Sequence, residues 1–189
     1  MTIRSIKATL KFLYLSLAIL AAACSSPASI PAGGAAVPHF EELARAVSSG
    51  STKDIAALFQ FSTMPCTKAE GMGGPPKCLA DEAEGTRVEV LPILGPEGHH
   101  MRRSEAGAWA GIGAAQLYAA YRISKSTYSD EFFPAGAYGV AFVLADKANG
   151  VVFQVTEQGI VRIDYQLLSS IDETLKDSEV IVGPIQPAQ

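Results

Sequence analysis

Two adjacent histidines, His99 and His100, are the residues of this chain best suited to acid–base chemistry near neutral pH. They stand in a polar stretch, 95–103, that is rich in turn residues and also holds Arg102 and Arg103. Neighbouring side chains of a strand point to opposite faces, so the pair cannot chelate one ion together. Two interpretations stay open: a solvated loop, or an acid–base or ligand role for one histidine.

A carboxylate, Asp164, lies two residues from Arg162 in a run of alternating apolar residues. The alternation assigns Val161, Ile163 and Tyr165 to the core, so Arg162 and Asp164 are expected on the opposite face. A solvent-exposed ion pair is the simpler interpretation of that placement. A base is the alternative, and it requires Asp164 to point into an enclosed pocket.

Three tyrosines form another candidate group. Tyr118 and Tyr121 belong to one strand-like run, and their spacing of three places them on opposite faces. Tyr138 begins the next such run. The three are expected either to pack in the core with their hydroxyls at its rim, or to line an apolar ligand pocket.

Motifs of well-known enzyme classes are absent from the sequence, which has no Gly-x-Ser-x-Gly elbow, no His-Glu-x-x-His and no calcium loop. The glycine-rich run 71–77 lacks the Gly-Lys-Ser/Thr ending of a phosphate loop, and its prolines remove backbone donors. We therefore expect binding without catalysis and no cofactor or metal, and an enzyme is the alternative hypothesis.

The start of the chain has the composition of an export signal. Arg4, Lys7 and Lys11 precede an apolar stretch that is shorter than the about 20 residues needed to span a bilayer. The run 20–24, Leu-Ala-Ala-Ala-Cys, resembles a bacterial lipoprotein signal. The resemblance implies removal of residues 1–23 and attachment of lipid, including palmitate-type chains, to Cys24. Plain secretion and an uncleaved anchor are the alternatives.

The expected mature chain is acidic. Of 15 basic residues three leave with the signal, so 12 remain against 19 acidic residues, a net charge of −7. Such a charge argues against nucleic acid as a partner. We expect an exported domain, outside the cytoplasm, tied by its lipid to a bacterial cell membrane or outer membrane.

The cysteine count predicts a disulfide. With Cys24 taken by lipid, Cys66 and Cys78 remain, and two such residues pair in an oxidising compartment. The alternative, a metal site, needs further ligands at suitable spacing, and none lies nearby in the sequence. The bond would close a loop rich in glycine and proline.

The elements that position these residues follow from hydrophobic periodicity. Residues 24–37 are small and uncharged and predict a flexible tether, and 38–176 form a single domain. Two short helices, separated near Gly50, are expected at its start. The residues from 71 to 85 are expected to form a loop, and 177–189 a loose tail. The strands are expected at 86–94, 115–123, 137–145, 151–157 and 160–168, with the Asn149-Gly150 dipeptide in a tight turn.

This order predicts an α+β domain, in which an N-terminal helical hairpin packs on a curved, mainly antiparallel sheet that ends in a four-strand meander. The element order and the closing run 157–165, Glu-Gln-Gly-Ile-Val-Arg-Ile-Asp-Tyr, resemble the nuclear-transport-factor-2-like (cystatin-like cone) superfamily. The resemblance implies a pocket inside the sheet, and an Asp base where such domains are enzymes.

The expected function is a lipid-anchored domain that binds a small apolar ligand or an envelope protein without catalysis. The alternatives are a cone-fold enzyme with Asp164, His99 or His100 as base, and a structural module of the envelope. The last of these would present a contiguous apolar patch on its surface.

Overall fold

The computed structural model describes residues 34, 36–71, 73–124 and 131–185. Residues 1–23, Cys24 and most of the expected tether therefore lie outside the described residues. Within the described part of the chain, no helix has both the length and the apolar character needed to cross a membrane.

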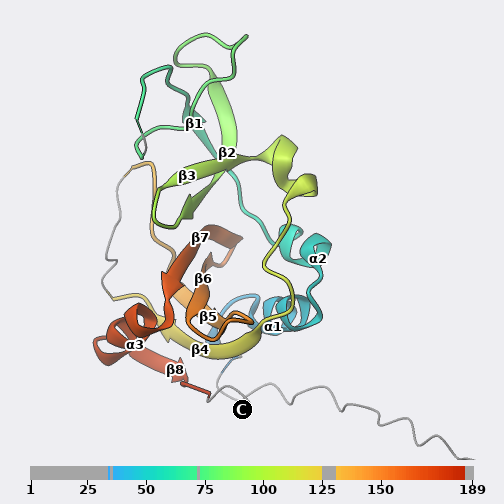
Figure 1. Cartoon of the computed structure of the whole chain (residues 1–189), viewed down its shortest axis with the longest axis vertical. Helices are drawn as coiled ribbons and strands as arrows, with labels where there is room; N and C mark the ends of the chain where they lie inside the picture. The colour runs from blue at the N-terminus through green and yellow to red at the C-terminus, as the bar shows by residue number, and fades with distance from the viewer. Residues whose placement is uncertain (1–33, 35, 72, 125–130, 186–189) are drawn as a thin grey trace, which may run out of the picture.

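The chain folds as a mixed α+β domain around one open, mostly antiparallel sheet of eight strands (Figure 1). Its elements are α1 (Phe40–Ser49), α2 (Thr52–Ala56), β1 (Ser62–Pro65), β2 (Arg87–Leu94), β3 (His99–Arg102), the 3₁₀ helix η2 (Arg103–Ala108), β4 (Gln116–Arg122), β5 (Tyr138–Val143), β6 (Asn149–Thr156), β7 (Gly159–Leu167), α3 (Leu168–Lys176) and β8 (Glu179–Val182).

The strand order is β1-β2-β7-β6-β5-β4-β8, and β3 pairs with β2 beside this path. Strands β4 to β7 are sequential antiparallel neighbours, which is the meander that the sequence predicts. Strands β2 and β7 pair in parallel over two positions alone, Ile93 with Ile163 and Leu94 with Asp164. The two strands therefore separate directly after Leu94.

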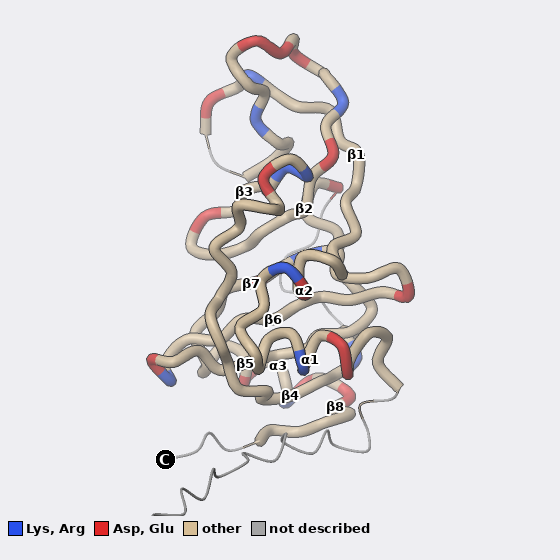
Figure 2. The backbone as a smooth tube through the Cα atoms, turned by 90° about the vertical axis from the view of Figure 1, so that its right-hand side faces the viewer, with Lys and Arg blue, Asp and Glu red and all other residues tan. Residues whose placement is uncertain are grey.

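Strands β1 and β3 and the described residues of the insert, 66–71 and 73–86, project from one end of the sheet (Figure 1). Charged residues gather in this projecting part, whereas the strands of the meander carry few along their length (Figure 2). The small core of this part contains Met64, Cys66, Val88 and Val90.

Helix α1 buries a face that recurs at helical spacing, and Phe40, Leu43 and Val47 on it are at most 1% exposed. Gly50 ends the helix in the left-handed conformation, at φ 69°, where it donates to two carbonyls of the last turn. Ser51 caps α2 by accepting a hydrogen bond from the Asp54 N–H. Phe40, Leu43, Ala46 and Val47 of α1 and Ile55 of α2 join the larger apolar core of the sheet.

Two β-bulges decide which side chains share a face. In β7, Ile160 pairs with Val155 and Arg162 with Gln154, so Val161 is an extra residue in the ladder. Ile160 and Ile163 consequently both belong to the larger core, and Arg162 lies opposite Gln154 on the other face. Simple alternation, which predicts one face for Ile160 and Arg162, is wrong at this point.

The same irregularity occurs in β4. Leu117 pairs with Phe142 and Ala119 with Ala141, so Tyr118 is the extra residue. Tyr118 and Tyr121 therefore lie in one buried cluster on one face, not on opposite faces as their spacing predicts.

The expectation of an exposed Arg162–Asp164 pair is wrong, because the second face of the sheet is also covered. Helix α3 packs on it through Ile171 and Leu175, and the segment 131–136 lies against β6 and β7 through Phe133. Arg162 is 1% exposed and Asp164 is 3% exposed.

Several boundaries differ from the expectation. Residues 179–182 of the expected loose tail form β8, which pairs with β4 because this sheet edge offers free backbone groups. Val37, assigned to the tether, is buried in the core. His99 and His100 lie in strand β3 and not in a turn.

The Asn149-Gly150 pair begins strand β6, and the turn falls just before it. Lys147, at φ 57°, supplies the left-handed residue of that turn, and the Asp146 carboxylate accepts hydrogen bonds from the Ala148 and Asn149 backbone. Gly150 serves packing: a Cβ there would lie 2.5 Å from Cδ1 of Ile171 on α3.

Candidate functional site

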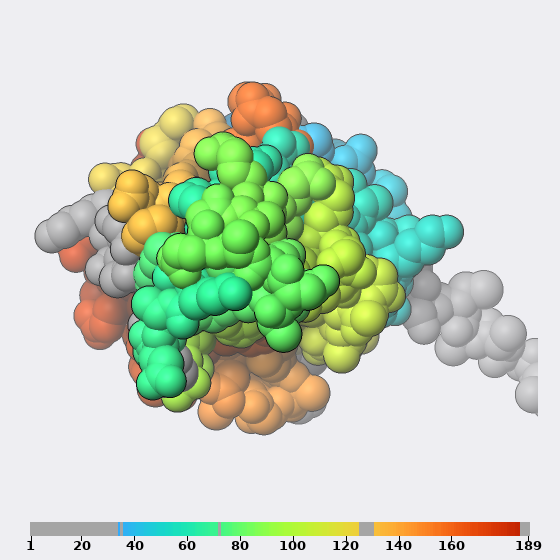
Figure 3. Space-filling model, turned by 90° about the horizontal axis from the view of Figure 1, so that it is seen from above, coloured from blue at the N-terminus to red at the C-terminus, as the bar shows by residue number. Residues whose placement is uncertain are grey.

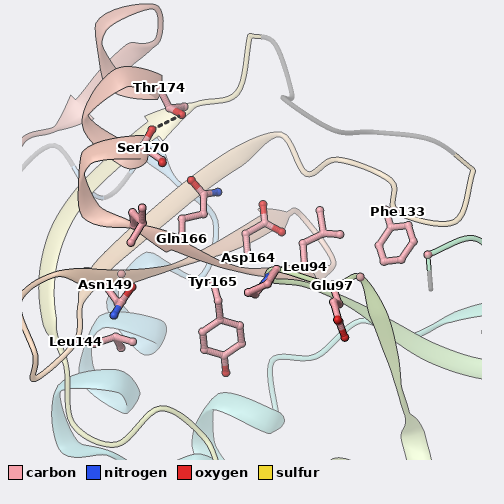
Figure 4. Close-up of a pocket in the computed structure, with 16 residues that line it drawn as sticks. Leu94, Glu97, Phe133, Leu144, Asn149, Asp164, Tyr165, Gln166, Ser170 and Thr174 are labelled. Carbon is pink, nitrogen blue, oxygen red and sulfur yellow. Dashed lines mark hydrogen bonds between the residues drawn. The ribbon is translucent and has the colours of Figure 1, made fainter. Parts of the chain in front are cut away.

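An open cleft of about 910 Å³ lies where β2 leaves β7, and Figure 4 shows its lining. The end of β7 and helix α3 form one side, and the turn after β2 forms another. Seen from above, the projecting part, in green, lies in front of the rest of the domain, with a recess beside it (Figure 3). The lining residues are Gly73, Leu94, Gly95, Pro96, Glu97, Gly98, Phe133, Leu144, Asn149, Gly150, Asp164, Tyr165, Gln166, Leu167, Ser170 and Thr174.

A buried ion pair reaches the wall of this cleft. Arg162 Nε donates to Asp164 Oδ1 at 2.7 Å, and Nη2 donates to Oδ2 at 2.9 Å. Nη1 donates to the Phe133 carbonyl at 2.9 Å, so the guanidinium also holds the segment 131–136. This two-pronged geometry is the strong form of the arginine–carboxylate pair.

Gln154 extends the pair into a network across the strands. Its Nε2 donates to Asp164 Oδ2 at 2.6 Å, and its Oε1 accepts from the Gly136 N–H at 2.8 Å. Among the described residues, no buried side-chain N or O atom lacks a hydrogen-bond partner. The network therefore compensates the burial of two charges and fixes the Asp164 carboxylate at the cleft.

Tyr121 lies in the same cross-strand row as Gly139, Gln154 and Arg162. A Cβ at Gly139 would meet the Tyr121 ring at 2.5 Å, so glycine lets the ring lie flat over β5. Burial, and then the charge of Asp164, raise the pKa of Tyr121 well above its ordinary value. The hydroxyl therefore stays protonated beside the ion pair.

The polar rim of the cleft has hydrogen-bonding groups that the fold does not use. Gln166 follows Asp164 on the same side of β7, and its amide makes no hydrogen bond to any described residue. Ser170 and Thr174 stand one helical turn apart on α3, and Thr174 Oγ1 donates to the Ser170 carbonyl at 3.0 Å. In Figure 4 the Asp164 and Gln166 side chains point toward the α3 side, and Tyr165 points the other way.

The described residues that line the cleft offer no cationic group for an anion. Among the described residues that line it, the carboxylates are those of Glu97 and Asp164, and no residue is Lys, Arg or His. Arg162 balances the charge of Asp164 from behind. The electrostatics thus favour an uncharged or cationic ligand.

The two candidate histidines border a different, smaller cleft of about 320 Å³, together with Cys78 and Arg102. His99 is exposed. His100 is half-buried, and its Nε2 donates to the Phe132 carbonyl at 2.9 Å while its ring lies 4.6 Å from that of Phe133. The structure therefore does not bring His99 or His100 to Asp164 in the larger cleft.

The three candidate tyrosines are packing residues in this structure. None of the described residues that line the larger cleft is Tyr118, Tyr121 or Tyr138. Tyr118 donates to Asp172 at 2.5 Å, and burial raises its pKa to about 12. Tyr138 is half-buried, with the Arg122 guanidinium 5.0 Å from its ring centre.

Cys66 and Cys78 form the expected disulfide, with a Cα–Cα distance of 4.9 Å. Glu82 lies close enough to make a three-residue metal-ligand group, but disulfide sulfurs are not thiolate ligands. Glu82 instead accepts two hydrogen bonds from Arg102, at 2.7 and 2.6 Å, which lower the pKa of its carboxyl. The disulfide and the Glu82–Arg102 ion pair therefore have a structural role in the projecting part.

Sequence reasoning missed Gln154, Gln166 and Ser170. Gln154 interrupts the apolar run Val-Val-Phe-Gln-Val of β6, and a polar residue inside such a run is the signal that could have found it. Gln166 and Ser170 carry no comparable signal, since both are common surface residues.

Comparisons of the chain with protein-family models, with curated proteins and with solved structures give no match.

Proposed function

We propose that this protein is an exported, lipid-anchored domain that binds a small uncharged ligand in the cleft between β2, β7 and α3. The signal-like start and Cys24 support the anchor, as does the run of small, uncharged residues that follows Cys24 and is suited to a tether. We also propose that the domain is similar to the cone-shaped domains, with a helical hairpin packed on a curved sheet.

The observation that supports the binding function is the size of the cleft together with the lack of cationic side chains among its described lining residues. Leu94 and Tyr165 give the about 910 Å³ cleft apolar surface. The charged groups among its described lining residues are Asp164, which Arg162 balances, and the exposed Glu97. A cleft of this size, with few polar groups at fixed places, is typical of small-molecule sites. We therefore favour an uncharged ligand that presents an apolar face.

An enzyme with Asp164 as base has one observation in its favour, since Asp164 lines the cleft. Three of the about four acceptor positions of that carboxylate, however, are already filled by Arg162 and Gln154, which hold it as a fixed hydrogen-bond acceptor. The geometry supports binding better than catalysis.

Saturation-transfer NMR can test the binding function on the full chain in phospholipid nanodiscs. The probes are 2-phenylethanol, phenethylamine and phenylacetate, which share a ring and differ in charge. We expect transfer to 2-phenylethanol and none to phenylacetate. Ser170→Trp should fill the cleft and abolish the transfer, while Ser169→Trp, on the exposed neighbour outside the cleft, should not. Equal transfer to all three probes, or none to 2-phenylethanol, contradicts the proposal.

The anchor has its own test. Cells that express the full chain are fed an alkyne-bearing palmitate, and the protein is then examined for label and by mass spectrometry of its N-terminus. We expect label on Cys24, and its loss in Cys24→Ala. An unlabelled mature chain that begins elsewhere than Cys24 would refute the anchor and leave the binding proposal intact.

A further inference from the structure

The unused hydrogen-bonding groups of the cleft define what kind of ligand it fits. The Asp164 carboxylate offers about four acceptor positions. Three are filled by Arg162 and Gln154, and Oδ1 holds one donor alone. One acceptor position therefore remains on a carboxylate that is almost wholly buried and borders the cleft.

Gln166 adds the complementary groups. A side-chain amide provides two donors and an acceptor, and this amide is not used by any described residue. Its side chain lies between those of Asp164 and Ser170 in Figure 4. The hydroxyl of Ser170 likewise makes no hydrogen bond within the described part of the chain. The three side chains form a polar track of acceptors and donors along the end of β7 and the start of α3.

An apolar surface faces the same cleft. Tyr165 borders it with a half-buried ring. Leu94 and Leu167 also line the cleft, and Leu167 is 58% exposed. A ligand of suitable chemistry must satisfy donors and acceptors on one side and present C–H groups on another.

We propose that the cleft binds a neutral saccharide, an inference that rests on the small-ligand function proposed above. Adjacent hydroxyls of a sugar donate and accept at once, which matches the Asp164 acceptor and the Gln166 amide. The C–H face of a sugar ring packs on an aliphatic surface such as Leu94, which pairs with Asp164 where β2 and β7 meet. Sugars that carry a carboxylate or phosphate find no cation among the described lining residues and are repelled by Glu97.

The test measures binding of the full chain, in nanodiscs free of sugar-based detergent, to an array of immobilised oligosaccharides. The array pairs neutral oligosaccharides with acidic ones of similar size. We expect binding to neutral members and none to those that carry uronic acid or phosphate. Gln166→Ala should weaken binding to the best neutral oligosaccharide about tenfold, the effect of losing about 1.4 kcal/mol. Gln60→Ala, a change at an exposed glutamine outside the cleft, should leave it unaltered.

The outcomes separate this inference from the function on which it rests. Binding of 2-phenylethanol without binding of any neutral oligosaccharide overturns the saccharide class alone. Loss of both overturns the small-ligand function as well. Preference for acidic oligosaccharides also overturns the inference. So does equal affinity of Gln166→Ala and the unaltered chain, because the polar track would then not contact the ligand.

Discussion

On one face of the sheet, Phe153 and Ile163 are fully buried among apolar side chains under α1 and α2. One position away along the same two strands, the opposite face buries Gln154 and Arg162 in a hydrogen-bonded network. The first face is held by the hydrophobic effect, which tolerates change of shape more readily than change of polarity. The second face depends on directed bonds, and the cleft opens on that face. The face that is less tolerant of substitution is therefore the one that positions the candidate site.

The largest effect expected is from Asp164→Asn, which keeps the shape of the side chain and removes the carboxylate that holds Arg162. Breaking a buried pair in this way costs about 3–5 kcal/mol of unfolding free energy. Ile163→Val, on the neighbouring residue and the apolar face, should cost about 1 kcal/mol. Urea unfolding of the full chain measures both.

A double substitution tests whether the cost comes from the unpaired charge that Asp164→Asn leaves behind. Arg162→Met with Asp164→Leu replaces both charges by apolar groups of similar size, and such replacements are often neutral. We expect the double variant to be more stable than Asp164→Asn. If Asp164→Asn proves as mild as Ile163→Val, the two faces do not differ in the way described.

The disulfide should matter next. Changing both cysteines, Cys66→Ser with Cys78→Ser, opens a short loop and should cost about 3 kcal/mol in the chain-entropy model. Gly73, inside that loop, lines the cleft and donates to the Gly98 carbonyl at 3.3 Å. We therefore expect weaker binding of 2-phenylethanol in addition to lower stability. If the unaltered chain has the same unfolding free energy under reducing and oxidising conditions, the prediction is contradicted.

Gly139→Ala probes the row that holds Tyr121 and the ion pair. The added Cβ would lie 2.5 Å from the Tyr121 ring, so the ring must shift, at about 1–3 kcal/mol. Gly107→Ala is the matched control, because a Cβ there meets nothing within 4 Å. Thermal unfolding monitored by near-ultraviolet circular dichroism would report both the stability and the tyrosine environment.

The smallest effect concerns Tyr118, at the far end of the polar face. Tyr118→Phe removes the hydrogen bond to Asp172 and should cost about 1 kcal/mol at neutral pH. The folded state raises the pKa of Tyr118 to about 12, so it favours the protonated hydroxyl. That contribution is complete below about pH 10, the ordinary tyrosine value, and is lost as the pH rises through about 12.

The measurement is the difference in unfolding free energy between the unaltered chain and Tyr118→Phe as a function of pH. We expect the difference to shrink between pH 10 and pH 12, with the other tyrosines cancelling. A difference that grows with pH would show that the hydroxyl is not held as described.

Sequence alone determined the elements whose cause is local. The meander follows from β-branched and aromatic runs separated by turn residues, and the Cys66–Cys78 bond follows from the number of cysteines once Cys24 is set aside. The end of α1 at Gly50 is likewise local, because a left-handed residue is needed there. Export, the lipid anchor and the resemblance to cone-shaped domains stay predictions.

The tertiary structure alone decided which side chains meet. The bulges at Tyr118 and Val161 shift the faces of β4 and β7, and no local pattern in those runs marks an extra residue. Whether Asp164 is exposed depends on α3 and on the segment 131–136, which cover it from elsewhere in the chain. Hydrophobic periodicity predicts which residues of a strand alternate between its two faces. Whether a given side chain is buried depends on how the strands pair and on which segments pack over each face of the sheet. The cleft exists because β2 and β7 separate after two paired positions, a fact of long-range register.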